Sequence, residues 1–320
     1  MSAPLRTHSA AHRQPATVPT GPVAARSVLT VGVIGAGRVG ATLGAALTAA
    51  GHRVVAASGL SGTSRARLAL LLPDVPRRPA ASVARAATDL VLIAVPDDAL
   101  AGVVTGLAAD GVLRPGQVVA HTSGAHGLAV LAPAAAAGAR PLALHPAMTF
   151  TGTPDDLDRL PGISYGVTAP AELRPLAARL VADLGGVPEW IGEADRTLYH
   201  AALAHGANHL VTLVNEAADR LREAGVGQPE KVLAPLLRAA LENALHLGDD
   251  ALTGPVSRGD AGTVERHLAR LAATAPESVA AYLALARRTA DRALAAGRLR
   301  PMDAEPLLDL LYSDHTEVAA

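Results

Sequence analysis

Three glycines, at positions 35, 37 and 40, follow a short apolar segment and have the spacing that a bound dinucleotide requires. Gly35 can form the tight turn after a strand, and Gly37 lets the backbone approach a pyrophosphate. Gly40 lets the next helix pack close to the sheet, and the first N–H groups of that helix would hold the phosphates. We therefore predict a dinucleotide site rather than a purely structural strand–turn–helix. The cofactor contacts expected here are Gly35, Ala36, Gly37, Arg38, Val39 and Gly40.

The segment after the second predicted strand, residues 51–57, decides which dinucleotide is expected. An NAD site usually has a carboxylate at the end of that strand, which accepts hydrogen bonds from the ribose. Here Ser58 comes first, Arg65 and Arg67 follow, and no carboxylate occurs before Asp74. Guanidinium groups form charge-assisted, forked hydrogen bonds to phosphate. The segment favours NADP(H), with Ser58 and Arg65 as contacts; a solvated loop with the arginines on the next helix is the alternative.

Short polar loops follow three further predicted strands. Open α/β sheets bind ligands outside the carboxyl ends of their strands, so these loops are expected to meet at one site. Gly124 would let the chain pass close to a nicotinamide or a substrate. His121 and His145 can equally hydrogen-bond the backbone, and Asp97 can cap a helix instead of contacting a ligand. The predicted cofactor contacts are Val95, Pro96, Asp97, Ser123 and Gly124, and Ser123 and His145 are also predicted to contact the substrate.

The elements that must position these residues alternate along the chain. Short β-rich apolar segments and alanine-rich helical segments predict an α/β fold with a Rossmann-type, doubly wound, mostly parallel sheet, and from about Asp195 the periodicity predicts an all-helical domain. We expect a disordered tail at 1–27, a dinucleotide-binding domain at 28–193 and a substrate and dimerisation domain at 194–320. The predicted strands include 28–34, 51–57, 89–95, 117–123, 140–145, 163–167 and 187–191, and the predicted helices 195–224, 229–247, 260–272, 276–296 and 303–312.

Composition excludes several classes of function. The formal net charge of -1 removes the electrostatic case for nucleic-acid or anionic-membrane binding, and the tail lacks the apolar core of a secretory signal. The chain has no cysteine, which rules out disulfides, thiolate catalysis and zinc–thiolate sites. No metal site is predicted. We expect a cytoplasmic protein whose partners are small molecules or another copy of itself.

The glycine motif, Ala94–Asp97 and His121–Gly124 resemble the N-terminal motifs of the 6-phosphogluconate dehydrogenase-like clan. This clan includes ketopantoate reductase, pyrroline-5-carboxylate reductase, prephenate dehydrogenase and the deazaflavin-dependent NADP reductases. More specific similarity lies further on, in Tyr199-His200-Ala-Ala with Asn208, in Thr253–Asp260 and in Arg266-His267-Leu268. Over residues 28 to about 312, the chain resembles uncharacterised Rossmann-like proteins that carry a characteristic C-terminal helical domain of unknown function.

The residues of the predicted first interdomain helix indicate where a proton donor could lie. His200, Asn208 and Asn215 fall on one helical stripe, beside a packing stripe that includes Tyr199, and aligned polar groups of this kind often line a cleft. An exposed polar face is the alternative. Histidine titrates near neutral pH, so we predict His200 as the donor and Asn208 as its orienting partner. The rival donors on the neighbouring stripe are His205 and His209.

The segment 253–260 is the predicted substrate clamp. The sequence indicates no structural role for Arg258, and its guanidinium could bind a carboxylate through two hydrogen bonds. Asp260 can instead serve as the N-cap of the following helix, within a helix–helix turn. Ketopantoate reductase-like enzymes use a lysine as proton donor, but Lys231, the only lysine, does not match that motif. The predicted substrate contacts are Thr253, Arg258, Asp260, Ser123 and His145.

Together these residues predict an NADPH-dependent oxidoreductase that reduces a small, carboxylate-bearing carbonyl or imine. Kinship makes a ketopantoate-like 2-oxo acid the leading substrate. The alternative is a sensor or scaffold that binds NADP(H) without catalysis, which the missing lysine motif suggests. Reduced deazaflavin is a further possible hydride source. The resemblance also implies a homodimer formed through the helical domain.

Overall fold

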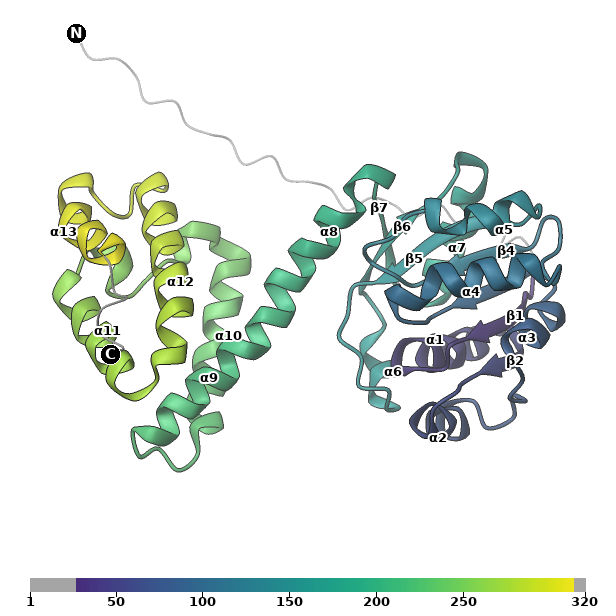
Figure 1. The fold of residues 1–320 in the computed structure, drawn as a ribbon, viewed down its shortest axis with the longest axis horizontal. Coiled ribbons are helices and arrows are strands. Elements are labelled where there is room, and N and C mark those ends of the chain that lie inside the picture. Colours follow the sequence, from purple (N-terminus) through teal and green to yellow (C-terminus); the bar gives the residue numbers. More distant parts are fainter. Residues whose placement is uncertain (1–26, 314–320) are drawn as a thin grey trace, which may run out of the picture. The chain divides into compact units, whose positions relative to one another are not determined.

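The computed structural model describes residues 27–313, and the chain divides into two compact units, residues 1–202 and 203–320 (Figure 1). The first unit contains the sheet and the second is helical. The disordered tail expected at 1–27 lies outside the described residues except for Ser27. Among the described residues, no helix combines the length and the apolar character needed to cross a membrane.

The sheet of the first unit has seven strands in the order β2-β1-β3-β4-β5-β6-β7. All neighbouring strands pair in parallel except β5 and β6, which are antiparallel, so the mostly parallel Rossmann-type sheet predicted from the sequence is confirmed. The chain reverses strand order between β1 and β3, where open α/β sheets bind their ligands. The strands are β1 (Thr30–Ile34), β2 (Arg53–Ser58), β3 (Leu90–Ile93), β4 (Val118–His121), β5 (Arg140–Pro146), β6 (Ser164–Thr168) and β7 (Val187–Trp190).

Helices cover both faces of this sheet because the strands are apolar on both sides. Val31 and Val33 of β1 pack with residues of α1, α2 and α7 in one hydrophobic core. Ile34, which points to the opposite face, packs with residues of α3 and α4 in a second core. The helices are α1 (Arg38–Ala49), α2 (Gly62–Leu71), α3 (Ala80–Ala86), α4 (Asp97–Ala109), α5 (Ala132–Ala136), α6 (Asp155–Arg159), α7 (Arg174–Asp183) and α8 (Arg196–Leu203).

A buried carboxylate, Asp156 of α6, organises the loop that precedes it. It is 0% exposed and accepts hydrogen bonds from Gly152 N at 2.7 Å, Thr151 N at 2.9 Å and Thr151 Oγ1 at 2.9 Å. Burial alone would raise the pKa of Asp156, but these hydrogen bonds outweigh it and hold the pKa below its usual value. In the folded protein, the loop therefore stabilises the ionised carboxylate of Asp156.

We expect Asp156→Asn to lower the free energy of unfolding by about 2 kcal/mol, because hydrogen bonds to a charged acceptor are lost while shape is kept. Urea denaturation should show this, with the exposed neighbour Asp155→Asn as the control. Because the folded pKa lies below the unfolded value of 3.8, this contribution is present above that pH and is lost at lower pH. Equal stability of the two variants at pH 7 would contradict the assignment.

The second unit consists of helices only and has a core of its own. Val264 and Leu268 of α11 pack with Leu283 of α12 and Leu307 of α13. A π-helical turn, Ala204–Asn208, separates α8 from α9 where one continuous α-helix was predicted. The helices are α9 (His209–Glu223), α10 (Pro229–Leu247), α11 (Ala261–Thr274), α12 (Pro276–Ala295) and α13 (Pro301–Tyr312).

Candidate functional site

The three glycines after β1 have the conformations and the surroundings that their predicted roles require. Gly35 has a φ of +91°, which favours glycine, and forms the turn that leaves the strand. A Cβ on Gly40 would lie 2.2 Å from the Gly35 carbonyl oxygen, so the helix packs too closely for any side chain there. A Cβ on Gly37 would meet nothing within 4 Å, and no side chain caps α1. The start of α1 is therefore open to an anion, as a pyrophosphate requires.

A cavity of about 710 Å³ lies beside this turn, at the strand ends of β1, β2 and β3. Its size is within the range of small-molecule and cofactor sites. Five of the predicted cofactor contacts line it: Gly35, Gly37, Ser58, Val95 and Pro96. The other predicted contacts are not among its lining residues: Ala36, Arg38, Val39, Gly40, Arg65, Asp97, Ser123 and Gly124.

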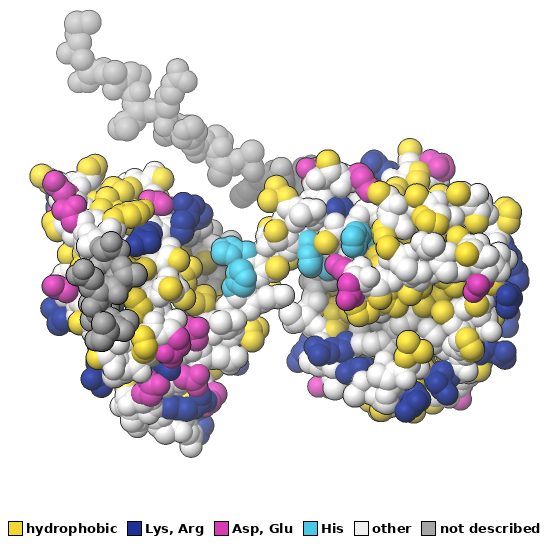
Figure 2. Space-filling view, in the orientation of Figure 1, with side chains coloured by type: hydrophobic (Ala, Val, Ile, Leu, Met, Phe, Trp, Pro, Cys, Tyr) yellow, Lys and Arg dark blue, Asp and Glu magenta, His cyan; other side chains and the backbone are white. Residues whose placement is uncertain are grey.

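The positive charge in this cavity comes from two arginines that the sequence analysis did not select. Arg77 and Arg78 line the cavity together with Ser61 and Ser64, whereas Arg65 does not. The Arg78 backbone N–H donates to the Ala57 carbonyl at 2.9 Å, which fixes this loop beside the end of β2. Neither arginine forms an ion pair with a described residue, and no described carboxylate lines the cavity. Figure 2 shows further basic side chains over the part of this unit where α2 and α6 lie.

The loops after β3 and β4 place two predicted residues in structural roles. Asp97 does not cap α4: the N-cap is Pro96, and Asp97 lies in the first turn, where its charge complements the helix dipole. The hydroxyl of Ser123 accepts a hydrogen bond from His126 N at 3.1 Å within its own loop.

His121 has both ring nitrogens engaged with the backbone. Nδ1 accepts from Ser123 N at 3.2 Å, so Nε2 carries the proton and donates to the Gly127 carbonyl at 2.7 Å. The ring is 0% exposed, and burial lowers the pKa of His121 to about 4. His121 is therefore a neutral, structural histidine, the alternative that its position left open.

His145, at the end of β5, is held by Tyr199 of α8. Its Nδ1 lies 3.0 Å from the Tyr199 hydroxyl, and the two rings meet edge to face. Burial lowers the pKa of His145 to about 4, and the nearby His200 and Arg196 lower it further, so the imidazole is neutral at neutral pH. Tyr199 lies across β6 at Gly166, where a Cβ would be 2.5 Å from the hydroxyl oxygen. Gly166 is thus required for this contact.

Arg196, also on α8, is a buried cation that no described carboxylate pairs with. It is 1% exposed; Nε donates to Thr168 Oγ1 at 2.8 Å and Nη2 donates to the Gly166 carbonyl at 3.1 Å. Nη1 is buried with no acceptor among the described residues. The guanidinium lies 5.9 Å from the centre of the Tyr199 ring. Burial lowers the pKa of Arg196, whereas Tyr199 and Glu193 raise it.

Gly124 makes room for two of the predicted site histidines. A Cβ there would lie 2.6 Å from Cδ2 of His200 and 3.0 Å from Nε2 of His145. The two imidazole rings have their centres 6.1 Å apart. The structure thus brings together Gly124, Ser123, His145 and His200, all of which were predicted separately. Figure 2 shows histidine side chains at the surface of this unit, close to acidic ones.

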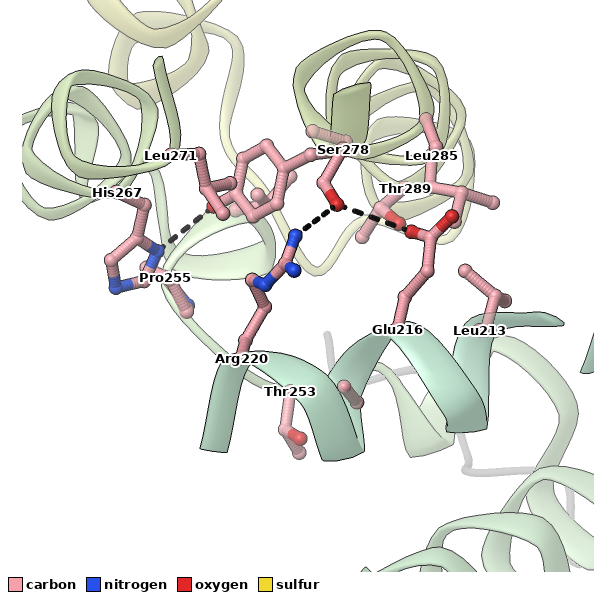
Figure 3. A pocket seen from close by; sticks show the side chains of 15 residues that line it. Leu213, Glu216, Arg220, Thr253, Pro255, His267, Leu271, Ser278, Leu285 and Thr289 are labelled. Atoms are coloured by element: carbon pink, nitrogen blue, oxygen red, sulfur yellow. Dashed lines mark hydrogen bonds between the residues drawn. The ribbon is translucent and has the colours of Figure 1, made fainter. Parts of the chain in front are cut away.

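The remaining predicted residues belong to the helical unit. Asn208 is the last residue of the π-helical turn, and the rival donors His205 and His209 contact each other, with their Nδ1 atoms 3.0 Å apart. Asp260 caps α11 by accepting from Thr263 N at 3.0 Å, which is the structural alternative considered for it. Arg258 is exposed, and its side chain makes no hydrogen bond to the described residues. Thr253 lines a cavity within this unit (Figure 3).

Comparison with known proteins agrees with this two-part organisation. A model of a Rossmann-like domain matches residues 15–146, and a model of a domain of unknown function, DUF2520, matches residues 163–289. No curated protein matches the chain. The fold and the family models together define a Rossmann-like protein with a helical C-terminal domain. Within this class, the chain joins a Rossmann-like domain to a region that matches DUF2520.

Several solved structures share the fold. A candidate NADP oxidoreductase of Bacteroides fragilis is 21% identical with a TM-score of 0.68, and the match covers 82% of this chain and 98% of that one. A reductive aminase of Aspergillus terreus, solved with NADPH, is 20% identical with a TM-score of 0.60, covering 85% and 96%. A pyrroline-5-carboxylate reductase of Streptococcus pyogenes is 19% identical with a TM-score of 0.55, covering 84% and 99%.

Proposed function

We propose that this protein is an NADPH-dependent oxidoreductase that reduces a small, carboxylate-bearing carbonyl or imine. The observation that carries the proposal is the pairing of a cavity lined by glycines and arginines with a neutral, half-buried histidine, His145, at the strand ends of the same sheet. Structures with this fold include proteins described as NADP oxidoreductases, pyrroline carboxylate reductases and a reductive aminase, which agrees with the class of reaction.

NADP(H) is the cofactor that the cavity favours. The ribose end of the site would lie at Ser58, Ser61 and Ser64, where Arg77 and Arg78 supply positive charge. A 2′-phosphate would receive hydrogen bonds from these guanidinium groups, which have no described carboxylate to satisfy them. When bound, the reduced nicotinamide supplies a hydride to the substrate carbon. Reduced deazaflavin is the alternative hydride source.

His145 is the proton donor that the geometry favours. Burial raises the pKa of Tyr199, although Arg196 and the Gly166 backbone oppose this rise, so the hydroxyl keeps its proton and can donate it to Nδ1 of His145 at 3.0 Å. The His145 proton then resides on Nε2, next to Gly124. A neutral imidazole can donate from this position, as in other enzymes that hold histidine neutral.

The proton balance of this step involves three side chains. As the substrate oxygen or nitrogen gains negative charge, Nε2 of His145 gives up its proton to it, and Nδ1 takes the proton of the Tyr199 hydroxyl. Tyr199 becomes a phenolate, whose charge the buried Arg196 offsets, and solvent later returns the proton. This relay gives a reason for an arginine that is buried without a carboxylate. His200, which contacts His145, is the alternative donor.

The proposed function is tested by NADPH oxidation against a panel of 2-oxo acids, ketopantoate among them, and cyclic and acyclic imines that carry a carboxylate. We expect saturable oxidation with at least one class. Arg258 is the candidate clamp for the substrate carboxylate, and Arg258→Ala should then raise KM more than it lowers kcat. Tight NADPH binding without oxidation of any member of the panel would favour the sensor or scaffold instead.

We propose further that the protein is a homodimer formed through the helical unit. Leu241 and Leu245 lie one turn apart on α10 and are 52% and 78% exposed, and Val211 of α9 is 58% exposed. Exposed apolar residues grouped in this way indicate a covered surface. Light scattering should give a mass twice that of the 32.3 kDa chain, and Leu241→Asp with Leu245→Asp should give a monomer. A monomeric parent protein would contradict this prediction.

A further inference from the structure

The helical unit contains a cavity of about 440 Å³ that the proposed reaction does not use (Figure 3). Its walls come from α9, α11, α12 and the segment 253–256. A cavity of this volume is large enough for a small organic molecule. All of its walls belong to one compact unit, so it is a feature of the helical domain by itself.

Most of the wall is apolar. Leu213, Leu271 and Leu285 contribute aliphatic surface from three helices, and Tyr282 adds an aromatic ring. The polar end of Tyr282 is already satisfied, since its hydroxyl lies 2.9 Å from Nδ1 of His267. These side chains therefore offer surface for a hydrocarbon group rather than free hydrogen-bonding capacity.

The cation of the cavity, Arg220, forms hydrogen bonds and ion pairs through both of its terminal nitrogens. Its Nη1 donates to Glu277 Oε1 and to Ser278 Oγ, both at 3.0 Å, and its Nη2 donates to Glu223 Oε1 at 2.8 Å. Its Nε is buried and has no acceptor among the described residues. Because two carboxylates already neutralise this guanidinium, Arg220 is a poor site for an anion.

Glu216 lies one turn before Arg220 on α9 and, unlike Arg220, has no oppositely charged partner in the described part of the chain. Its carboxylate forms no ion pair with any described residue, and its one hydrogen bond there is a 3.5 Å contact from Ser278 Oγ (Figure 3). Glu223 and Glu277 lie outside the lining of the cavity and neutralise Arg220, so Glu216 is the carboxylate of the lining that has no described cation paired with it. Glu216 is half-buried at the wall of the cavity, and its carboxylate is available to pair with a bound cation through a charge-assisted hydrogen bond.

From this arrangement we propose that the cavity binds an organic ammonium ion, a protonated amine with a hydrocarbon body, whose charge pairs with Glu216. The body of the ligand lies against the leucines and the Tyr282 ring. The inference does not depend on NADPH or on turnover, because every group that it uses lies within the helical unit. A protein that oxidises no NADPH with any substrate would still bind such an amine.

The test compares three probes with the same body, hexylammonium, hexanoate and hexanol, by isothermal titration calorimetry with the full-length protein at pH 7. We expect hexylammonium to bind at least tenfold more tightly than the other two, a difference of about 1.4 kcal/mol. This series uses the parent protein only, so it does not depend on the folding of any variant. Tighter binding of hexanoate or hexanol, or no saturable binding of hexylammonium, would overturn the proposal.

Two matched variants identify the carboxylate. Glu216→Gln keeps the shape of the side chain and removes its charge, and should weaken hexylammonium binding at least tenfold. Glu265→Gln removes an exposed carboxylate that does not line the cavity, and should leave the affinity within about twofold. Circular dichroism checks that both variants are folded. Equal affinity of Glu216→Gln and the parent protein would show that Glu216 does not hold the charge.

Discussion

His145→Ala should lower kcat for NADPH oxidation by about 10²- to 10⁴-fold, the usual range for loss of a positioned proton donor. The affinity for NADPH should change little, since His145 does not line the cofactor cavity. Tyr199→Phe, which keeps the ring and removes the hydroxyl, should cost less, about tenfold or more, because His145 loses the group that replaces its proton. His246→Ala, at an exposed position on α10, serves as the control.

The pH dependence distinguishes this donor from a cationic one. With a pKa of about 4, His145 is neutral through the neutral range and keeps its Nε2 proton, so kcat/KM should stay level from about pH 5 to about pH 8. A cationic imidazole of ordinary pKa would instead lose activity as the pH rises above about 6.5. A profile of that second kind, or full activity of His145→Ala, would exclude His145 and favour His200.

The lowered pKa of His145 also changes the stability of the folded protein with pH. The pH profile of kcat/KM must therefore be separated from the effect of pH on folding. Below pH 6.5 the unfolded chain takes up a proton at His145 before the folded chain does. The free energy of unfolding therefore decreases as the pH falls from 6.5 towards 4. Circular dichroism at each pH separates loss of the fold from loss of the proton donor.

The helices and strands could largely be predicted from the sequence, because the patterns that indicate them involve residues that are close together in the chain. The turn at Gly35 and the close packing at Gly40 depend on backbone geometry that only glycine permits, so their spacing is visible in the sequence. The alternation of strands and helices follows in the same way from burial on both faces of the sheet. The π-helical turn at 204–208 was missed, since it leaves no pattern distinct from a continuous helix.

The site was predicted less completely, because its contacts join distant parts of the chain. His145 and Tyr199 are separated by 54 residues, and only the folded sheet brings them together across Gly166. Arg196 reads in sequence as an ordinary charged residue at the start of a helix; nothing local indicates that it is buried. Tyr199 was recognised within a motif, yet its contact with His145 could not be predicted from helical spacing.

In the cofactor cavity, too, a contact between distant parts of the chain could not be predicted. The sequence pointed to Arg65 as the phosphate contact, whereas Arg77 and Arg78 line the cavity. Arg65 was the natural prediction, as the first arginine after β2 with no carboxylate between. The next loop returns to β2 instead, through the hydrogen bond from Arg78 N to the Ala57 carbonyl. This hydrogen bond joins residues that lie on either side of helix α2. It places Arg77 and Arg78 at the cavity.

Replacing Arg77 and Arg78 by alanine should therefore weaken NADPH binding by about 10²- to 10⁴-fold, because one charge-assisted hydrogen bond from each arginine to a phosphate contributes about 1.5–3 kcal/mol. NADH, which has no 2′-phosphate, should change by less than about threefold. Fluorescence titration of the two nucleotides measures both. Arg65→Ala is the matched control, and its affinity for NADPH should remain close to that of the parent protein. If Arg65→Ala loses affinity for NADPH and the variant without Arg77 and Arg78 does not, the 2′-phosphate contact lies on α2. If the parent protein binds NADH more tightly than NADPH, the cofactor is NAD.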